Sequence, residues 1–458
     1  MNSADDIGRR LDRLAISRAH IKLISLIAAG MFFDSFDIYI ASGVLGAMVK
    51  SGESTLSLNA TFLSVTFIGM MLGAWFSGIL GDRFGRRFCY QFNLALYGGA
   101  SIAGALAPSM SWLIFFRFFM GLGMGAEIVV GYGTLSEFIP ARNRGRFGAI
   151  LNLIINCSLF LSTFLGWLII PAYGWRWMFA IAGAGAGLVW FLRKSMPESP
   201  RWLAAHGRIA EAERIVRDIE AQSTAVPPST PAEPVQDIAA SPGRFGELFS
   251  RPLLKRTITG ITVLIALFTV NYAYVSWIPT FLVQQGHSVS SSLGLTTFMF
   301  AGGPLGSLIA MALSERLGRK WGLVLFSFVG IVLGIVYAFA TTPVMLVAAG
   351  FSVTACIYVL SSLSVATYVP ELFPTRLRLR GAGLSNAVGR GVNILMPYAV
   401  AAIFGAFGIT GVVTLTGGIL LLQAVIVGLI GAETRQRSLE DLAVEPSEPA
   451  GLVAKELS

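Results

Sequence analysis

Charged side chains are scarce in this chain of 458 residues. Only 13% of the residues are Asp, Glu, Lys or Arg, well below the ~25% of soluble domains, whereas 54% are hydrophobic and the mean hydropathy is +0.70. Apolar runs of about 18 or more residues recur along the whole chain, which excludes a large soluble enzyme with an apolar core. The composition therefore indicates an integral membrane protein.

Cysteine and histidine are rare as well, with three of each. The cysteines lie in or at the ends of the apolar runs without paired spacing, and the histidines lie outside these runs. Such a scattered set supplies neither a disulfide framework nor a metal site. A membrane enzyme would also need a catalytic motif such as H-E-x-x-H, which the sequence lacks. We therefore expect no metal, no cofactor and no enzymatic activity.

About twelve membrane-spanning helices fit the apolar runs, because a crossing takes roughly 20 residues of helix. The charged segment 1–21 precedes the first run without an A-x-A-like cleavage site, so we expect the first helix to be retained. The predicted fold class is an all-α integral membrane protein with twelve transmembrane helices. The runs are 22–49, 57–80, 88–107, 112–136, 147–170, 177–192, 257–283, 292–313, 321–340, 344–369, 382–405 and 409–431.

The basic residues are distributed unevenly. A net charge of +9 could indicate a nucleic-acid partner, but of the 34 Lys and Arg residues only Lys50 and Arg176 fall on odd-numbered connections. Arg117 and Arg390 lie within predicted helices, and the others share the side of the N-terminus. By the positive-inside rule that side is cytoplasmic. We expect a multi-pass protein of the cell (inner) membrane, with both termini in the cytoplasm, that contacts the lipid bilayer and no nucleic acid.

The composition changes between the sixth and seventh runs. In residues 197–222, Ser199 is a candidate N-cap and apolar stripes interrupted near Gly207 predict short helices, whereas the Pro/Ser/Ala-rich residues 223–243 predict a flexible linker. No loop could hold the domain that a non-transporting receptor would need. The expected organisation is a cytoplasmic N-terminal segment (1–21), an N-terminal six-helix bundle (22–192), a cytoplasmic linker with short helices (193–256), a C-terminal six-helix bundle (257–431) and a cytoplasmic tail (432–458).

Three short motifs recur in the two halves at nearly equal offsets, which indicates a duplication. Two similar bundles with the connection inside are related by an axis along the membrane normal, and such proteins bind their substrate at the midplane between the halves. The pairs are "GDRFGRR" (81–87) with "SERLGRK" (314–320), "EFIPARNRG" (137–145) with "ELFPTRLRL" (371–379), and "PES" (197–199) with "AET" (432–434).

The order of the motifs resembles that of the major facilitator superfamily. The resemblance rests on G-x-x-x-D-R-x-G-R-R at 78–87, R-x-x-x-G-x-G-x-G at 117–125 and "PESPRWL" at 197–203, and it covers nearly the whole chain. It implies two pseudo-symmetric six-helix bundles and transport by alternating access. The glycines of the second motif predict close helix contact, not a nucleotide-binding loop. "RLDRL" followed by "FFDSFD" is similar to the metabolite:proton symporters, which include nicotinate and aromatic-acid transporters.

The duplicated charged motifs predict a gate. The acid and arginines of "GDRFGRR" can bind neighbouring helix ends, and Glu137 with Arg144, like their repeats, can close a cytoplasmic charge network that joins the halves. The alternative is that these charges only set the topology. The predicted gate comprises Asp82, Arg83, Arg86, Glu137, Arg144, Glu315, Arg316, Arg319, Glu371 and Arg378.

Two aspartates interrupt the first apolar run. Asp34 and Asp37 lie about 60° apart around a helix, and we expect their shared face to line the transport cavity. The resemblance to proton-coupled sugar porters aligns Asp37 and Arg117 with a first-helix acid and a fourth-helix arginine, which implies a proton switch. Burial favours the neutral carboxyl group and the arginine favours the charged one, so a small movement can change its state. The alternative is a static ion pair.

Asp34 and Glu127 complete the candidate group for proton coupling. Asp34 is either a second proton carrier or a hydrated residue near a mouth of the pathway. Glu127, ten residues after Arg117, points about 80° away from it and serves either coupling or structure.

Arg390 lies within the eleventh run, where an unpaired cation is costly unless an anion meets it. The metabolite and aromatic-acid symporters have a similar G-R element, whereas the glutamine pair and the tryptophan of sugar porters are absent from the seventh and tenth runs. We predict a monomeric secondary transporter that binds protons and a small organic carboxylate; a sugar:proton symporter, a proton-driven exporter and an uncoupled facilitator are the alternatives. The predicted substrate contacts are Arg390, Asn271, Tyr274, Trp277, Asn152 and Asn393. The alternative for the two aromatic residues is that they only pack between helices.

Overall fold

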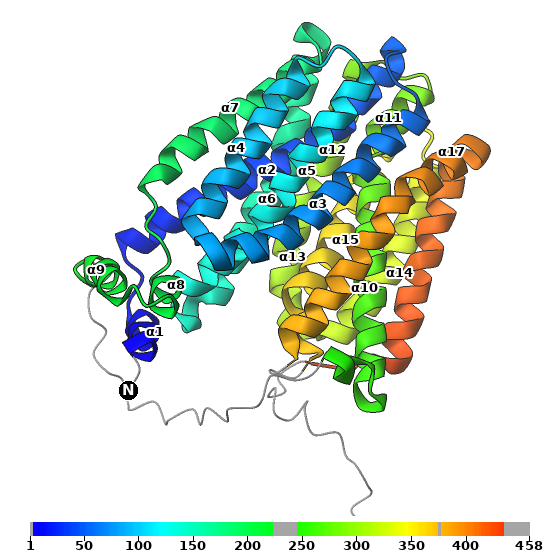
Figure 1. Cartoon of the computed structure of the whole chain (residues 1–458). Helices are drawn as coiled ribbons and strands as arrows, with labels where there is room; N and C mark the ends of the chain where they lie inside the picture. Colours follow the sequence, from blue (N-terminus) through cyan, green and yellow to red (C-terminus); the bar gives the residue numbers. More distant parts are fainter. Residues whose placement is uncertain (1–2, 223–244, 374–376, 435–458) are drawn as a thin grey trace, which may run out of the picture.

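The protein is helical throughout the residues that the computed structural model describes, 3–222, 245–373 and 377–434 (Figure 1). The N-terminal half contains α2 (Arg18–Ser51), α3 (Leu56–Phe84), α4 (Arg86–Ala105), α5 (Met110–Phe138), α6 (Ala141–Tyr173), α7 (Arg176–Leu192) and the short 3₁₀-helix η1 (Arg193–Ser195). The C-terminal half contains α10 (Arg251–Val275), α11 (Ile278–Gln284), α12 (Val289–Phe300), α13 (Gly302–Leu317), α14 (Arg319–Ala338), α15 (Pro343–Ser361), a π-helix (Ser362–Tyr368), α16 (Val369–Glu371) and α17 (Arg378–Ile430).

Twelve segments of these helices cross the membrane. Within the described ranges, nine helices are long and apolar enough to do so, and α17 is one of them. α17 holds two crossing segments, because Gly408 at φ 62° interrupts its 53 residues. The other two segments are α4, with 20 residues, and α7, with 17. The predicted all-α fold with twelve transmembrane helices is confirmed.

Each half contains the same tight turn between two of its helices. Gly85 joins α3 to α4 at φ 90°, and Gly318 joins α13 to α14 at φ 79°. Positive φ is accessible to glycine at little cost but is unfavourable for other residues. The duplication seen in "GDRFGRR" and "SERLGRK" is therefore also present in the backbone.

The glycines of the fourth membrane helix bring α5 close to α3. A Cβ atom added to Gly121 would lie 2.6 Å from the carbonyl oxygen of Thr66, and one added to Gly125 would overlap the backbone of Met70. No larger side chain fits between the two backbones at these points. The predicted close helix contact is confirmed.

The halves touch through α2, α3 and α6 on one side and α11, α12, α13 and α17 on the other. Tyr39 and Asn156 lie near the middle of α2 and α6, and Thr61 lies near the start of α3, away from the chain termini. The halves therefore meet in the middle and at the end opposite to the termini. Among the described residues, hydrogen bonds between the halves join Tyr39 to Tyr358 at 2.9 Å, Asn156 to Ser307 at 2.6 Å and Tyr398 to Thr61 at 3.1 Å.

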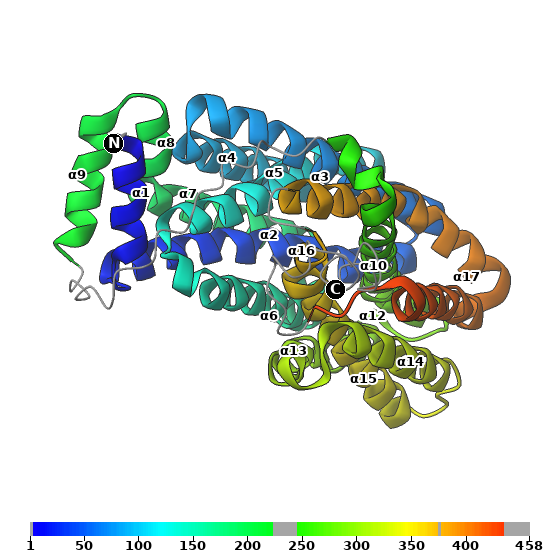
Figure 2. The ribbon, with the colours of Figure 1, turned by 90° about the horizontal axis from the view of Figure 1, so that it is seen from below.

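Three short helices, α1 (Ser3–Arg13), α8 (Pro200–Ala205) and α9 (Ile209–Glu220), pack together beside the N-terminal half (Figure 2). Ser199 caps α8 by accepting a hydrogen bond from the N–H of Trp202 at 3.2 Å, and Gly207, at φ 75°, separates α8 from α9. The predicted cap and the predicted interruption are both confirmed.

We call the side of the molecule that carries α1, α8, α9 and residue 434 the basic end, because the arginine-rich motifs lie there. Arg10 of α1 and Glu220 of α9 form an ion pair of 2.7 Å on this side. The linker predicted over 223–243 and the tail from residue 435 onward lie outside the described residues.

Candidate functional site

A buried ion pair lies inside the N-terminal half. Asp37 of α2 and Arg117 of α5 form a salt bridge, with side chains 0% and 1% exposed. Arg117 Nε also donates to Oγ1 of Thr66 on α3 at 2.9 Å, and the guanidinium lies 4.8 Å from the ring centroid of Phe62. Three helices thus hold together the two residues that the sequence aligned. We refer to them as the first ion pair.

A second buried ion pair joins Glu127 of α5 to Arg193 of η1 at 2.6 Å, with side chains 2% and 0% exposed. Arg193 donates from Nε to the carbonyl oxygen of Leu26 at 2.9 Å and lies over the ring of Tyr90, 4.4 Å from its centroid. Gly30 leaves the space for this pair, because a Cβ there would lie 2.6 Å from Glu127 Oε1. The sequence analysis missed Arg193, which directly follows the sixth apolar run and was assigned to the linker.

Asp34 lies between the two ion pairs. Its side chain is 1% exposed, and no hydrogen-bond donor of the described chain reaches either carboxylate oxygen. Both ion pairs interact with it electrostatically. In this structure Asp34 is therefore buried in the N-terminal half and not exposed at a mouth of the pathway. We expected this face of α2 to line the transport cavity, but Asp34 and Asp37 lie inside the N-terminal bundle, where α5 covers them.

Arg390 is a half-buried cation on α17. Its Nε donates to Oδ1 of Asn386, one turn earlier, at 2.8 Å, and its guanidinium lies 5.4 Å from the ring centroid of Phe268 on α10. Within the described part of the chain this is the one hydrogen bond that Arg390 donates. The fork formed by Nη1 and Nη2 is therefore available to an anion.

A narrow cavity of about 10 Å³ lies between the halves. Asn393, three residues after Arg390, is one of the residues that line it. Phe67 of α3 and Tyr272 of α10 form one side, with ring centroids 4.5 Å apart, and Trp277 and Asn393 lie beside them. Asn393 is buried, and within the described chain its side-chain oxygen and nitrogen have no hydrogen-bond partner. The structure thus brings together two of the predicted substrate contacts.

The other predicted substrate contacts lie apart from this cavity or beside it. Tyr274 lies in the core of the C-terminal half, with its ring centroid 6.2 Å from that of Tyr337. Asn271 is half-buried next to Tyr272, and its Oδ1 has no hydrogen-bond partner within the described chain. Asn152 is half-buried on α6, one turn before Asn156. The sequence analysis missed Tyr272, because the direction of neighbouring side chains depends on the packing of α10.

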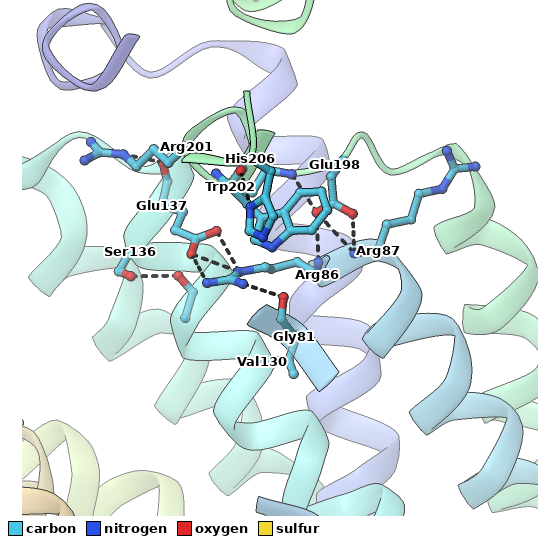
Figure 3. A network of polar contacts seen from close by, with 12 residues as sticks. Gly81, Arg86, Arg87, Val130, Ser136, Glu137, Glu198, Arg201, Trp202 and His206 are labelled. Carbon is cyan, nitrogen blue, oxygen red and sulfur yellow. Dashed lines mark hydrogen bonds and ion pairs between the residues drawn. The ribbon is translucent and has the colours of Figure 1, made fainter. Parts of the chain in front are cut away.

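The basic end of the N-terminal half carries a charge network (Figure 3). Arg86 of α4 pairs with Glu137 of α5 at 2.7 Å and donates from Nη1 to the carbonyl oxygen of Gly81 at 2.6 Å. Glu198 accepts from the backbone N–H groups of Arg86 at 2.8 Å and Arg87 at 3.2 Å. The network therefore ties together the ends of α3, α4 and α5 and the segment before α8.

The C-terminal half has a matching network. Arg319 pairs with Glu371 at 3.4 Å, Thr434 Oγ1 donates to Glu371 at 2.5 Å, and Glu433 accepts from the backbone N–H of Arg319 at 3.0 Å. Glu433 stands in "AET" where Glu198 stands in "PES", so the repeat could have identified both residues. Each of the two networks described here stays within its own half.

Half of the predicted gate residues can be placed. Arg83 is exposed, 5.3 Å from the ring centroid of Phe84, and Arg86, Glu137, Arg319 and Glu371 form the pairs above. The side chains of Asp82, Arg144, Glu315, Arg316 and Arg378 lie outside the described residues.

The molecule consists of two six-helix bundles. Charges are buried in the first, and the second contains a half-buried cation. This arrangement is that of a multi-pass membrane transporter. The model of the family described as "Sugar (and other) transporter" matches residues 25–445. The chain belongs to this family, within the major facilitator superfamily, and the resemblance stated from the motifs is confirmed.

Known relatives and structures cover almost the whole chain. The inner membrane metabolite transport protein YdjE of Escherichia coli K12 is 40% identical over 97% of this chain and 99% of its own length. The niacin transporter NiaP of Acinetobacter baylyi is 32% identical over 96% of this chain and 100% of its own. The xylose transporter XylE of E. coli, in a partially occluded inward-open conformation, has a TM-score of 0.73 at 18% identity and covers 92% of this chain and 100% of its own. The chain is therefore a metabolite transport protein and not an enzyme.

Proposed function

We propose that this protein is a proton-coupled symporter of a small organic carboxylate in the cell (inner) membrane. The observation that carries the proposal is the separation of charges: a buried Asp37–Arg117 pair in one half and the half-buried Arg390 in the other. The relative NiaP supports the substrate class, because niacin is a pyridine carboxylate.

Asp37 and Arg117 form the proton switch of this mechanism. When Asp37 is ionised, the salt bridge holds α2 against α5. Protonation neutralises the carboxyl group and removes the Coulomb attraction, so the two helices can move apart at a lower cost. A proton thus selects between two arrangements of the N-terminal half.

Arg390 binds the substrate carboxylate through Nη1 and Nη2. A guanidinium fork matches the two oxygens of a carboxylate, and Asn386 already orients it through Nε. Asn271 and Asn393 supply polar atoms that have no partner within the described chain, and Trp277 supplies an aromatic face, for the rest of the substrate.

The basic end faces the cytoplasm, with both termini, and the protein acts as a monomer. The halves meet away from this end, so the structure corresponds to an inward-facing state of alternating access. The Arg86–Glu137 and Arg319–Glu371 networks fix the helix ends that approach each other when the cytoplasmic gate closes.

Uptake into proteoliposomes tests the proposal. Labelled nicotinate, 4-hydroxybenzoate and xylose are offered under an inward-directed proton gradient, with and without a proton ionophore. Protein-free liposomes are the control, because weak acids also accumulate passively along a pH gradient. We expect protein-dependent accumulation of a carboxylate that the ionophore abolishes.

Each other outcome points to a different transporter. Accumulation of xylose without either acid would make the protein a sugar symporter. Carboxylate uptake that is insensitive to the ionophore would make it a facilitator, and accumulation only under the reversed gradient would make it an exporter.

A further inference from the structure

Three positions follow one another along one face of α2. Gly30 lies against the second ion pair, Asp34 has no hydrogen-bond donor within the described chain, and Asp37 belongs to the first ion pair. Separations of four and three residues keep these positions on one side of a helix, about 6 Å and 4.5 Å apart along its axis. An unpaired acid therefore stands between two buried ion pairs.

The cluster contains more acid than base. Fully ionised, its three carboxylates and two guanidinium groups leave one negative charge, although all five side chains are buried. An ionised acid within the membrane costs about 2.5–3.5 kcal/mol even on the most lenient scales. One bound proton removes this charge, and Asp34 is the acid that has neither an arginine nor any other donor of the described chain attached.

The titratable groups around Asp34 come from several helices. Tyr97 of α4 donates to the carbonyl oxygen of Phe33 at 2.9 Å, so its hydroxyl is engaged. The charged and titratable groups that interact with Asp34 are Asp37 of α2, Arg117 and Glu127 of α5, Arg193 of η1, Tyr97 of α4 and Tyr272 of α10.

The second ion pair lies nearer to the basic end than the first. Arg193 donates to the carbonyl oxygens of Leu26 and Ile27, within the first turns of α2, at 2.9 and 3.1 Å. α5 runs antiparallel to α2, and Glu127 lies ten residues further along α5 than Arg117, about 15 Å closer to the basic end. The two pairs and Asp34 thus form a row directed toward that end.

We propose that Asp34, Glu127 and Arg193 form the inner part of a proton route that begins at Asp37. The O–H bond of protonated Asp37 breaks as one forms on Asp34, and a second transfer moves the proton from Asp34 to Glu127. Each transfer takes place when a water molecule or a side-chain rotation connects the two carboxyl groups, and Glu127 then releases the proton to water at the basic end. Arg193 carries no proton; it is a positioning residue that holds Glu127 and stabilises its anion. This route rests on the proton-coupled symport proposed above.

Neutral variants of the two acids test the route in proteoliposomes. Asp34→Asn and Glu127→Gln should lower accumulation under a proton gradient to the external concentration, because neither amide accepts and releases a proton. Counterflow at equal pH on both sides needs no net proton movement and should be retained. Glu53→Gln, at an exposed acid after α2, is the matched control and should keep both activities.

Arg193 is tested through the pH dependence of accumulation. Arg193→Gln removes the cation that pairs with Glu127, so the pH profile of accumulation should change, and Arg193→Lys should restore the wild-type profile. Arg193→Gln leaves the buried Glu127 carboxylate without its cation, which can prevent folding. In that case the double variant Glu127→Gln/Arg193→Gln, which removes both charges, should retain counterflow but lose accumulation. An unmoved pH profile in Arg193→Gln would show a merely structural pair.

The route and the symport proposal fail in different ways. A wild-type protein without ionophore-sensitive accumulation overturns the symport itself. Wild-type accumulation that persists in full in both Asp34→Asn and Glu127→Gln leaves the symport standing and overturns only the route. Loss of counterflow together with accumulation in both variants also overturns it, since the acids would then support structure or substrate.

Discussion

The two halves of the molecule share a fold but differ in the charges that they bury. Among its described residues, the N-terminal half encloses three carboxylates and two guanidinium groups. Residues 257–431, in contrast, contain only two acids, Glu315 and Glu371, and both belong to the duplicated motifs of the basic end. Groups that could carry a proton through the membrane interior are therefore confined to one half.

The ends of the halves have remained alike while the interiors have diverged. Gly85 and Gly318 make the same turn, and each is followed by an arginine whose backbone N–H donates to a glutamate. These contacts serve the fold of either half, whereas coupling and substrate recognition need different groups. The comparison indicates that the duplication supplied the fold of both halves, whereas in the mechanism that we propose the proton and the carboxylate bind to different halves.

The largest expected effect comes from removing the acid of the first ion pair. Asp37→Asn fixes a neutral group beside Arg117, so proton-driven accumulation should be lost, whereas counterflow at equal pH should survive. Glu53→Gln is the control again. Full accumulation by Asp37→Asn in proteoliposomes would contradict the assignment, and loss of counterflow as well would mean that Asp37 binds substrate or holds the structure.

The equivalent test in the C-terminal half concerns Arg390. Arg390→Lys replaces a fork by a point charge and should weaken carboxylate binding about tenfold, roughly 1.4 kcal/mol, with proton coupling intact. Arg390→Ala should weaken it further, by about 1.5–3 kcal/mol in all. Arg251→Lys, at an exposed arginine at the start of α10, is the control. Ligand-dependent thermal shifts measure the affinity, and unchanged affinity in Arg390→Ala would assign the carboxylate to another residue.

Sequence patterns predicted the features of the fold that depend on local sequence or on the internal repeat. Apolar length predicted the twelve segments, Ser199 and Gly207 predicted the boundaries of α8 and α9, and the repeated motifs predicted the duplication. The alignment with sugar porters brought Asp37 and Arg117 together, although 80 residues separate them.

Patterns failed where a long-range contact decides the role of a residue. Arg193 lies at the boundary of an apolar run, and nothing in its neighbourhood indicates a partner on α5, so it was read as part of a linker. Tyr272 and Tyr274 differ by two positions, about 200° around a helix, and only the packing of α10 determines which of them faces the N-terminal half.

A smaller effect is expected from the charge networks that the halves have in common. Glu137→Gln/Glu371→Gln should loosen the helix ends that approach each other when the cytoplasmic gate closes, so closure should become less favourable and the inward-open state more populated. The shift should be below about 1 kcal/mol, because each pair is partly exposed and is already formed in the inward-facing structure. Spin labels at Gly148→Cys on α6 and Gly383→Cys on α17, in a variant without the three native cysteines, report the separation of the halves there. A distance distribution that does not move to longer values would count against a gating role.

The smallest expected effect concerns the hydrogen bond between Tyr39 and Tyr358, which joins the halves away from the basic end. Hydrogen bonds between membrane helices contribute about 0.6 kcal/mol on average, so Tyr39→Phe should change the conformational equilibrium roughly threefold. The direction is opposite to that of the network variants, because this contact holds the inward-facing state. The same spin labels should therefore move to shorter distances.

The double variant sharpens this prediction. Tyr39→Phe alone leaves the Tyr358 hydroxyl buried without its partner, which adds a desolvation cost to the lost bond, and Tyr358→Phe does the converse. Tyr39→Phe/Tyr358→Phe leaves no hydroxyl behind, so its shift should be smaller than the sum of the single shifts. Tyr337→Phe, in the core of the C-terminal half, should leave the distances unchanged. Additive shifts, or an equal shift in Tyr337→Phe, would mean that the tyrosine pair packs between the halves without selecting a state.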